Sequence, residues 1–402
     1  MEILDIITVF EYQSIKVGHK DSCGKEFTKD HLKLLVRFRG EKDDDYFPYY
    51  TLIHNGVRFK QYVGILNVGG LQIEVLPKTD NSTNDTGLWR GHLITMLNTV
   101  YKLQTKAPTM ANQRLKSSPI LDVFLQRFLE EVERLLHVGL IKTYRQETGN
   151  RSSLKGKLLM SKHLMKNIVH KERFYVKYTT YDRNHLCNRI LYKALKIIPE
   201  VTGNGYIINR ARTLCFEFPE LLEVEVNGSL FNTMKYDRKS EEYKNAIEIA
   251  KLILLNFMPD LRKGRNSVLA LMFDMERLWE EYVYVMLKRK LTRYAVSAQQ
   301  STKFWERKTI RPDIVISTKD NTPLLVIDTK WKCPKDFRPS PGDLKQMYAY
   351  HRYWNVNNTI LLYPATNFSR PIGGVFQDEA GKLNDGSPCS CEMIFANIDE
   401  LV

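Results

Sequence analysis

Two acidic residues and one lysine in the segment 311–332 are the side chains of this sequence best suited to chemistry. The segment reads RPDIVISTKDNTPLLVIDTKWK, and Asp313 and Asp328 lie in two apolar runs rich in β-branched residues. Lys330 follows the second acid by two residues. A charged side chain is costly to bury without a partner, so acids in such runs indicate a functional site.

The two runs, 313–317 and 324–332, flank the polar sequence KDNTP, and this pattern predicts a β-hairpin. A turn centred on the DN pair would place Asp313 opposite Asp328, and opposed residues on one face have Cβ atoms roughly 4.5 to 5.5 Å apart. Lys330 shares the face of Asp328 because side chains alternate along a strand. A loop of this length does not fix the register, which is therefore an expectation.

The expected chemistry follows from two carboxylates that converge. They raise one another's pKa unless a cation neutralises them. A hard divalent ion held by carboxylates, water and substrate phosphate meets this need; Mg²⁺ suits it best, and Mn²⁺ is an alternative. With Lys330 orienting a water or neutralising charge, the reaction would be phosphodiester hydrolysis. The structural alternative is an ion pair of Asp328 with Lys330 at a strand edge, with Asp313 in a turn.

The elements that must position these residues surround the hairpin in the sequence. A long helix is predicted over 268–290, and it carries Glu280 and Glu281, either of which could face solvent. A second helix follows the hairpin and places Gln346 and Tyr350 on one face, at positions i and i+4, where they orient the site or only pack locally. The sequences TILLYPA and CEMIFANI predict two further strands.

Basic residues lead into the proposed site. The net charge of +14 favours an anionic polymer as partner, because phosphate contacts release counterions. Between 286 and 312 there are eight basic residues and one acidic residue, and the proline-containing loop 333–342 adds more basic side chains. The candidate DNA-binding residues are Lys303, Arg307, Lys308, Arg311, Lys332, Lys335 and Arg338.

Several other kinds of site are excluded by spacing. The six cysteines form no C-x-x-C pair and the nine histidines no H-E-x-x-H motif, which argues against zinc. Gly149 and Gly156-Lys157 have the wrong spacing for a phosphate-binding loop, so no nucleotide is expected to bind this chain itself. No run of transmembrane length and no signal peptide are recognisable, so no membrane partner and a cytoplasmic location are expected.

The patterns divide the chain into three segments and predict an α/β fold of the α+β kind. Residues 1–87 predict a β-rich N-terminal domain, 88–265 a mainly helical middle region, and 266–402 the domain that contains the hairpin. Strands are expected at 3–9, 32–38 and 49–54 and in a hairpin around Gly69-Gly70; helices are expected at 88–103, 119–140, 184–198 and 240–257.

The motif Pro312-Asp313, a spacer, and Asp328-x-Lys330 resembles the metal site of the PD-(D/E)XK nuclease superfamily. The resemblance implies a nuclease core with a mixed sheet flanked by helices in residues 266–402. It also implies an acid on the preceding helix, for which Glu280 is preferred, and a glutamine on the following one. The implied catalytic residues are Asp313, Asp328, Lys330, Gln346 and Glu280, and the implied metal ligands are Asp313, Asp328 and Glu280.

Most of the chain resembles McrC, the nuclease subunit of modification-dependent (5-methylcytosine) restriction systems. The segments that carry this resemblance are YVGILNVGGLQIEVLPK, LKGKL, DRNHLCNRILYKAL, RPDIVI, LLVIDTKWK and LKQMYAY. The resemblance implies a restriction endodeoxyribonuclease of type II/IV character that cuts DNA. Its N-terminal domain would engage McrB, a hexameric AAA+ GTPase that recognises modified DNA and translocates it. The alternatives are an inactive DNA-binding or motor-regulating adaptor with a vestigial nuclease fold, and a nuclease that acts without a motor.

Overall fold

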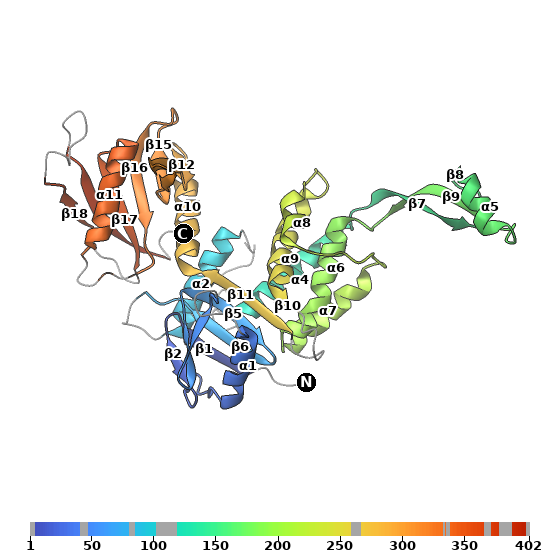
Figure 1. Cartoon of the computed structure of the whole chain (residues 1–402), viewed down its shortest axis with the longest axis horizontal. Helices are drawn as coiled ribbons and strands as arrows, with labels where there is room; N and C mark the ends of the chain where they lie inside the picture. The colour runs from blue at the N-terminus through green and yellow to red at the C-terminus, as the bar shows by residue number, and fades with distance from the viewer. Residues whose placement is uncertain are drawn as a thin grey trace. The chain divides into compact units, whose positions relative to one another are not determined.

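The computed structural model describes residues 5–40, 47–79, 85–101, 119–258, 267–332, 334, 338–365, 371–377 and 388–398. The chain forms two compact units, one within residues 121–269 and one within residues 4–120 and 270–402 (Figure 1). The first and third predicted segments thus belong to one unit, and the three-part division stays a prediction. None of the helices in the described ranges is long and apolar enough to cross a membrane.

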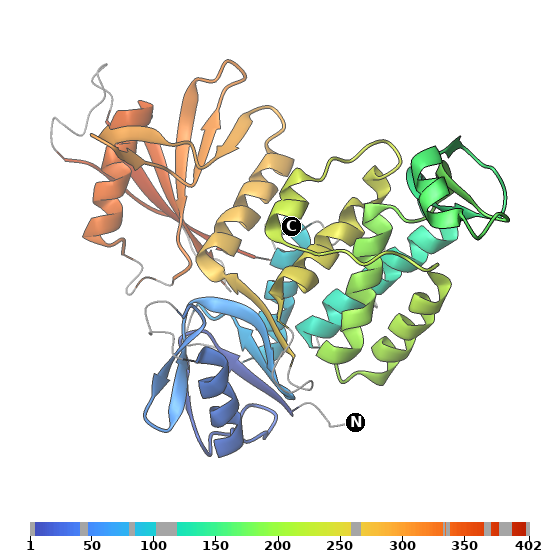
Figure 2. The same cartoon turned by 45° about the vertical axis from the view of Figure 1, so that its right-hand side comes forward.

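The unit within 121–269 is built on helices, as Figure 2 also shows. Its elements are α4 (Ile120–Val138), α6 (Leu186–Val201), α7 (Gly205–Glu217), α8 (Gly228–Thr233), the 3-10 turn η1 (Glu241–Tyr243), α9 (Lys244–Asn256) and the short strand β10 (Phe257–Met258). The helices predicted at 119–140, 184–198 and 240–257 are confirmed. The apolar stripe of α4 is buried at Leu121, Phe124, Phe128, Val132 and Leu135, as the 3.6-residue period requires.

A β-ribbon within this unit was not predicted. It pairs β7 (Thr143–Arg151) with β9 (Phe174–Asp182) in antiparallel register, and β8 (Lys157–Leu158) and α5 (Met160–Asn167) lie at its tip (Figure 1). Burial alternates along both strands, but most of their side chains are polar or tyrosine, so the sequence lacked the usual strand pattern. Gly156 has φ +83°, and a Cβ there would lie 2.3 Å from the carbonyl oxygen of Lys177, so this glycine allows close strand pairing.

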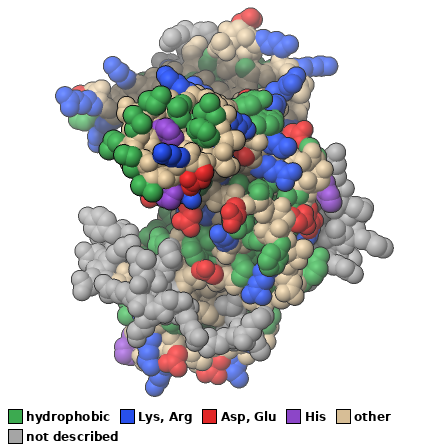
Figure 3. All heavy atoms as spheres, turned by 90° about the vertical axis from the view of Figure 1, so that its right-hand side faces the viewer, with side chains coloured by type: hydrophobic (Ala, Val, Ile, Leu, Met, Phe, Trp, Pro, Cys, Tyr) green, Lys and Arg blue, Asp and Glu red, His purple; other side chains and the backbone are tan. Residues whose placement is uncertain are grey.

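The ribbon tip exposes a group of apolar side chains, with exposed fractions between 58% and 82%. We call this group the tip patch: Leu154, Met160, Leu164, Met165, Ile168 and Val169. In the view onto this end of the molecule, hydrophobic side chains lie next to lysine and arginine side chains (Figure 3). Because soluble proteins seldom leave neighbouring large apolar side chains exposed, the tip patch indicates an interaction surface.

The other unit begins with an N-terminal sheet of order β1-β6-β5-β11, and β10 pairs with the first residues of β11. Its strands are β1 (Asp5–Phe10), β5 (Tyr62–Val68), β6 (Leu71–Leu76) and β11 (Val268–Asp274), and a smaller sheet contains β2 (Ser14–Lys16), β3 (Tyr50–Ile53) and β4 (Gly56–Phe59). The hairpin at Gly69-Gly70 and the strands predicted near 3–9 and 49–54 are confirmed. Helix α2 (Thr86–Val100), predicted for the middle region, belongs to this unit and contacts α10 (Met275–Lys290).

Two elements differ from their predictions. Residues 32–38, predicted as a strand, lie in helix α1 (Lys29–Arg39), because Thr28 and His31 form a reciprocal capping box and only Leu35 is buried. The long helix predicted over 268–290 is also wrong at its start: 268–274 form β11, and Asp274 caps α10 by accepting a hydrogen bond from the backbone N–H of Arg277.

Gly64 allows β5 and β11 to approach each other. Its φ is +128°, and a Cβ there would lie 2.1 Å from the carbonyl oxygen of Leu271. Replacing Gly64 by alanine adds backbone strain and a backbone clash, so we expect the free energy of unfolding to fall by about 3 kcal/mol. Thermal and urea unfolding would measure this loss. The matched control is Gly374→Ala, where a strand glycine has open space; equal effects of the two changes would contradict the explanation.

The C-terminal part of this unit contains the predicted hairpin in a mixed sheet of order β12-β15-β16-β17-β19-β18. Its strands are β12 (Ala295–Ala298), β15 (Ile314–Ser317), β16 (Pro323–Thr329), β17 (Asn358–Ala365), β18 (Ile372–Val375) and β19 (Ser390–Asn397). Helix α11 (Pro341–Trp354) buries Met347, Tyr350 and Trp354 against the sheet, so the helix that carries Gln346 is fixed by packing. A separate ribbon pairs β13 (Thr302–Trp305) with β14 (Lys308–Ile310).

Candidate active site

The hairpin brings the two predicted acids together. Strands β15 and β16 are antiparallel, with Ile314 paired with Ile327, so the next position places Asp313 opposite Asp328. This is the register expected from the sequence, and it is interrupted by an irregularity only near the turn, between Ile316 and Ser317. The acids therefore lie at the end of the hairpin away from the turn.

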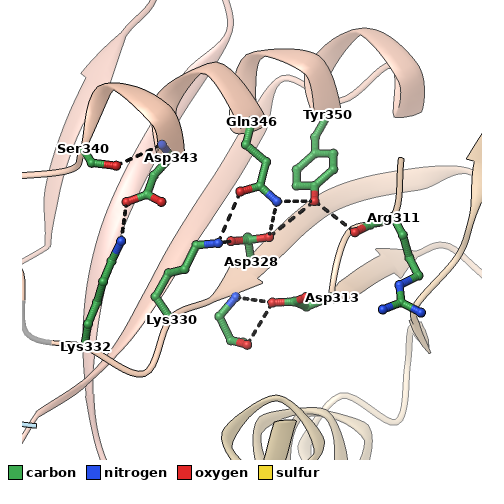
Figure 4. Close-up of polar contacts among 10 residues, drawn as sticks. Arg311, Asp313, Asp328, Lys330, Lys332, Ser340, Asp343, Gln346 and Tyr350 are labelled. Atoms are coloured by element: carbon green, nitrogen blue, oxygen red, sulfur yellow. Dashed lines mark hydrogen bonds and ion pairs between the residues drawn. The ribbon is translucent and has the colours of Figure 1, made fainter. Parts of the chain in front are cut away.

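Asp328 is buried, with 1% of its surface exposed, and is contacted from two sides. Its Oδ1 accepts a hydrogen bond from Gln346 Nε2 at 3.1 Å, and its Oδ2 forms an ion pair with Lys330 Nζ at 2.7 Å (Figure 4). Burial raises the pKa of Asp328 to about 6, Asp313 adds to the rise, and Lys330 opposes it. Apart from the ion pair, Oδ2 has no hydrogen-bond partner among the described residues, so this oxygen remains able to accept a cation.

Gln346 joins the acid to the lysine. Its Oε1 accepts a hydrogen bond from Lys330 Nζ at 3.2 Å, and its Nε2 also donates to the hydroxyl of Tyr350 at 2.8 Å. That hydroxyl donates in turn to the carbonyl oxygen of Arg311 at 3.0 Å (Figure 4). Burial lowers the pKa of Lys330, but the attraction of Asp328 outweighs it and leaves the pKa raised. Of the two roles considered for Gln346 and Tyr350, these contacts favour orientation of the site.

Asp313 is held by the strand that carries Asp328. Its Oδ2 accepts hydrogen bonds from the backbone N–H of Thr329 at 2.7 Å and from the Thr329 hydroxyl at 2.9 Å. A residue that only formed a turn would bond to its own neighbours, whereas these bonds span 16 positions. The second carboxylate is therefore fixed beside the first.

A cavity of about 730 Å³ contains all five predicted catalytic residues in its lining. Glu280 reaches it from α10 and accepts a hydrogen bond from Gln299 Nε2 at 2.7 Å. Burial raises the pKa of Glu280, Asp313 adds to the rise, and Gln299 opposes it. Glu281 instead pairs with Arg277 at 3.0 Å and lines a neighbouring cavity. Of the two glutamates, Glu280 is the one that faces the site.

The donor atoms of this cavity fit a hard cation. Asp313, Asp328 and Glu280 offer carboxylate oxygens, and Mg²⁺ is commonly held by one or two carboxylates, with water and substrate phosphate completing its shell. Within the described ranges, no three His, Cys, Asp or Glu side chains are close enough to form a complete metal site by themselves.

The predicted DNA-binding residues lie in different places. Arg311 and Lys332 line the cavity, and Lys332 Nζ forms an ion pair with Asp343 at 2.8 Å. On and beside the ribbon of β13 and β14, the exposed basic side chains are Lys303, Arg307 and Lys308. Arg338 is exposed, and Lys335 lies outside the described residues. The structure therefore brings two of the seven candidates to the acids.

Several charged residues near the site were missed from the sequence: Asp274, Glu276, Arg277 and Asp343 line the cavity, and Glu11 lies close by. Asp343 lies one turn before Gln346 and accepts the Lys332 ion pair; the S-P-G-D sequence at the start of α11 was its signal. Glu11 is 5% exposed, and its Oε1 accepts a hydrogen bond from Trp331 Nε1 at 2.7 Å. No local pattern could have indicated that contact, because it spans 320 positions.

The carboxyl of Glu11 should make stability depend on pH. Burial raises its pKa from 4.5 to about 7, so the folded chain keeps a proton that the unfolded chain loses. Its contribution to stability is complete below pH 4.5 and is lost as pH rises through about 7. Relative to Glu11→Gln, the unfolding free energy of the unaltered chain should fall by about 3 kcal/mol between pH 4 and pH 8. Urea unfolding across this range would measure it, and parallel pH curves would contradict it.

Fold and site together define an α/β protein with an acid-acid-lysine site in a charged cavity. The profile of the family described as "McrBC 5-methylcytosine restriction system component" matches residues 57–364. The chain belongs to this family. The resemblance to McrC seen in the sequence is thereby confirmed.

Individual relatives are distant. The "Type IV methyl-directed restriction enzyme EcoKMcrBC" of Escherichia coli (strain K12) is 21% identical over 236 residues, which are 54% of this chain and 66% of that protein, slightly under two thirds. A chain of the half-complex of Thermococcus gammatolerans McrB AAA+ hexamers with bound McrC has a TM-score of 0.71 at 20% identity, covering 98% of this chain and 94% of its own. A chain of the cryo-EM structure of the McrBC complex of that organism has a TM-score of 0.53 at 19% sequence identity. The match covers 75% of this chain and 89% of that chain.

Proposed function

We propose that this chain is the Mg²⁺-dependent DNA endonuclease subunit of an McrBC-type restriction system and hydrolyses phosphodiester bonds. The observation that carries the proposal is the convergence of Asp313, Asp328 and Lys330 in one cavity, with Gln346 bonded to both Asp328 and Lys330. Family membership supports the restriction role. The E. coli relative is named as a methyl-directed enzyme, and we propose modified DNA as the target here too.

The chain's own residues divide the chemistry among them. Asp313 and Asp328 provide oxygens for Mg²⁺, which when bound supplies Lewis-acid polarisation of the phosphate and an acidified water. Gln346 keeps Asp328 and Lys330 in fixed positions. Lys330 holds positive charge beside the carboxylates, where it can orient the attacking water or stabilise negative charge that develops on the phosphate. Arg311 and Lys332 are placed to contact the DNA backbone.

We propose an McrB-type AAA+ GTPase hexamer as the partner that recognises and translocates the DNA. Similar structures were solved with McrB AAA+ hexamers, which supports the assignment. The chain lacks a phosphate-binding loop of the required spacing, so the motor would be a separate protein. The resemblance to McrC implies a partner contact through residues 1–87, and the tip patch is a second candidate surface.

Charged substitutions in the tip patch should weaken the complex with the motor. Met165 and Val169 are 82% and 81% exposed, so Met165→Asp with Val169→Asp should leave the fold intact and reduce the affinity for the motor about ten-fold or more. Co-purification and titration calorimetry would measure the change. Phe216→Asp is the matched control, because Phe216 is 88% exposed on α7 of the same unit. Unchanged affinity would instead favour the contact through residues 1–87.

The function is tested by reconstitution. Purified chain is mixed with the McrB-type protein, GTP, Mg²⁺ and either methylated or unmethylated DNA. We expect cutting of methylated DNA only in the complete mixture, and loss of cutting when EDTA removes the metal. No cutting in any mixture that contains an active motor would count against the proposal.

The alternative is an adaptor that binds DNA or regulates the motor without cutting. One feature favours it: residues 1–265, about two thirds of the chain, lie outside the segment predicted to form the nuclease core. An adaptor should show no rise in thermal midpoint with Mg²⁺ or Mn²⁺, whereas a ligand that binds only the folded chain at about 100 times its Kd stabilises it by about 2.7 kcal/mol. Cutting by the isolated chain without nucleotide would favour a third possibility, a nuclease independent of a motor.

A further inference from the structure

The carboxyl of Glu11 connects the N-terminal sheet to the segment that follows β16, next to Lys330. Glu11 directly follows β1, and its Oε1 accepts hydrogen bonds from Trp331 Nε1 at 2.7 Å and from the backbone N–H of Lys78 at 2.8 Å. Its Oε2 has no hydrogen-bond partner in the part of the chain that is described. An apolar side chain would fill the same buried space at lower cost, so the carboxyl indicates a need for its acceptor oxygen.

Trp331 lies between Lys330 and Lys332, just beyond the last residue of β16. Its indole is 8% exposed and packs on the indole of Trp279 with ring centres 5.6 Å apart. Trp279 precedes Glu280 on α10. The ring of Trp331 is thus held by α10, and its N–H is held by Glu11.

Strand β16 ends at Thr329, so Lys330 lies just outside the strand. Its position therefore depends on the contacts of its own backbone and of the neighbouring Trp331. The backbone N–H of Lys330 donates to the carbonyl oxygen of Leu362 at 2.9 Å, which fixes one side of the segment. The indole of Trp331 fixes the other side. Lys330 directly precedes Trp331, and its ammonium lies 2.7 Å from Asp328 Oδ2.

The backbone beside Glu11 supports a dedicated role. Tyr12 has φ 59°, in the left-handed region that a bulky aromatic residue seldom adopts, although its side chain is 52% exposed. Strained backbone of this kind persists where the surrounding structure requires it, often near functional sites. The backbone N–H of Glu11 donates to the carbonyl oxygen of Leu76 at 2.9 Å, so β6 fixes the start of this turn.

We infer that Glu11 is a positioning residue of the nuclease site: it holds the Trp331 indole and thereby the alignment of Lys330 with Asp328. The inference rests on the proposed function. It assigns to the N-terminal sheet a direct part in the geometry of the cutting site, beyond any contact with a motor.

Three variants test this role in the complete cutting mixture. Glu11→Ala removes the acceptor, Trp331→Phe removes the donor and keeps a ring, and Glu11→Gln keeps an acceptor oxygen. We expect Glu11→Ala and Trp331→Phe each to lower kcat by about 10- to 100-fold with little change in KM, as loss of an outer contact to a metal site does. Glu11→Gln should retain kcat within a few-fold. The double variant that combines Glu11→Ala with Trp331→Phe should have a kcat no lower than that of either single variant. Asp30→Ala, which removes an exposed acid from helix α1, is the control.

A second measurement is independent of cutting. The indole N–H of Trp331, assigned in NMR spectra by its loss in Trp331→Phe, should exchange slowly with solvent in the unaltered chain and at least about ten-fold faster in Glu11→Ala. If the unaltered chain does not cut, the proposed function fails, and this exchange rate alone decides whether Glu11 holds the indole.

Three outcomes would contradict a positioning role of Glu11. Unchanged kcat in Glu11→Ala, or an unchanged exchange rate, refutes the inference. Equal losses in Glu11→Ala and Glu11→Gln, accompanied by equal falls in thermal midpoint, also refute it, because they show a role in folding. If Glu11→Ala does not fold, Trp331→Phe carries the test.

Discussion

Asp328→Ala should reduce cutting of methylated DNA by at least about a thousand-fold while the chain stays folded and bound to its motor. Asp328 is the point at which the site's contacts meet: Lys330 pairs with its Oδ2 at 2.7 Å, and Gln346 donates to its Oδ1 at 3.1 Å. The alanine removes an oxygen that we propose binds the metal, and it leaves Lys330 without its anion. Single-turnover cleavage, with co-purification of the motor, would measure both properties.

Two further variants make that result specific. Asp328→Asn keeps the shape of the side chain and an acceptor for Gln346, so equal inactivity of this variant would assign the loss to the missing charge. Asp320→Ala removes an exposed acid from the turn of the same hairpin and should leave cutting unchanged. Substantial cutting by Asp328→Ala would refute the assignment of the site and favour the adaptor.

Lys330→Met should reduce the rate of cutting by about 100- to 1000-fold, which is the loss typical of removing one group that stabilises transition-state charge. Methionine is unbranched and of similar length, so it fills the space between Asp328 and Gln346 without the ammonium. Because the carboxylates remain, metal binding should persist in calorimetry while kcat falls. That separation would distinguish a role in the reaction from a role in holding the ion.

The control for the lysine is Lys319→Met, which removes an exposed lysine from the turn of the same hairpin. It should cut like the unaltered chain. If Lys330→Met cut normally, the pair of Asp328 with Lys330 would have only the structural role of a strand-edge ion pair.

The site was predictable where its parts are close in sequence. The hairpin followed from two β-branched runs around a polar turn, and the expected opposition of Asp313 and Asp328 agrees with the pairing of Ile314 with Ile327. The hairpin and the opposition of its acids needed only local periodicity. Gln346 was predicted from the resemblance to PD-(D/E)XK nucleases, and its spacing of four residues from Tyr350 placed both on one helix face.

The remaining features depend on contacts that local patterns do not encode. Glu11 reaches Trp331 across 320 positions, and no period in the sequence connects them. Burial alternates along β7 and β9, but the positions hold mainly polar and tyrosine side chains, so the sequence does not show the usual apolar-polar alternation of a half-buried strand. Residues 32–38 have an apolar pattern that predicted a strand, but they form part of helix α1, which Thr28 caps at its N-terminus.

The place of β11 in the N-terminal sheet has a consequence for how the chain is made. Strand β5 ends at Val68, and its neighbour β11 begins at Val268, so roughly 200 residues are synthesised in between. At about 5 to 20 residues per second this takes about 10 to 40 seconds, during which the apolar edge of β5 has no partner strand. Fragments that end before β11 should therefore aggregate, and the ribosome or a chaperone must protect this edge until the strand arrives.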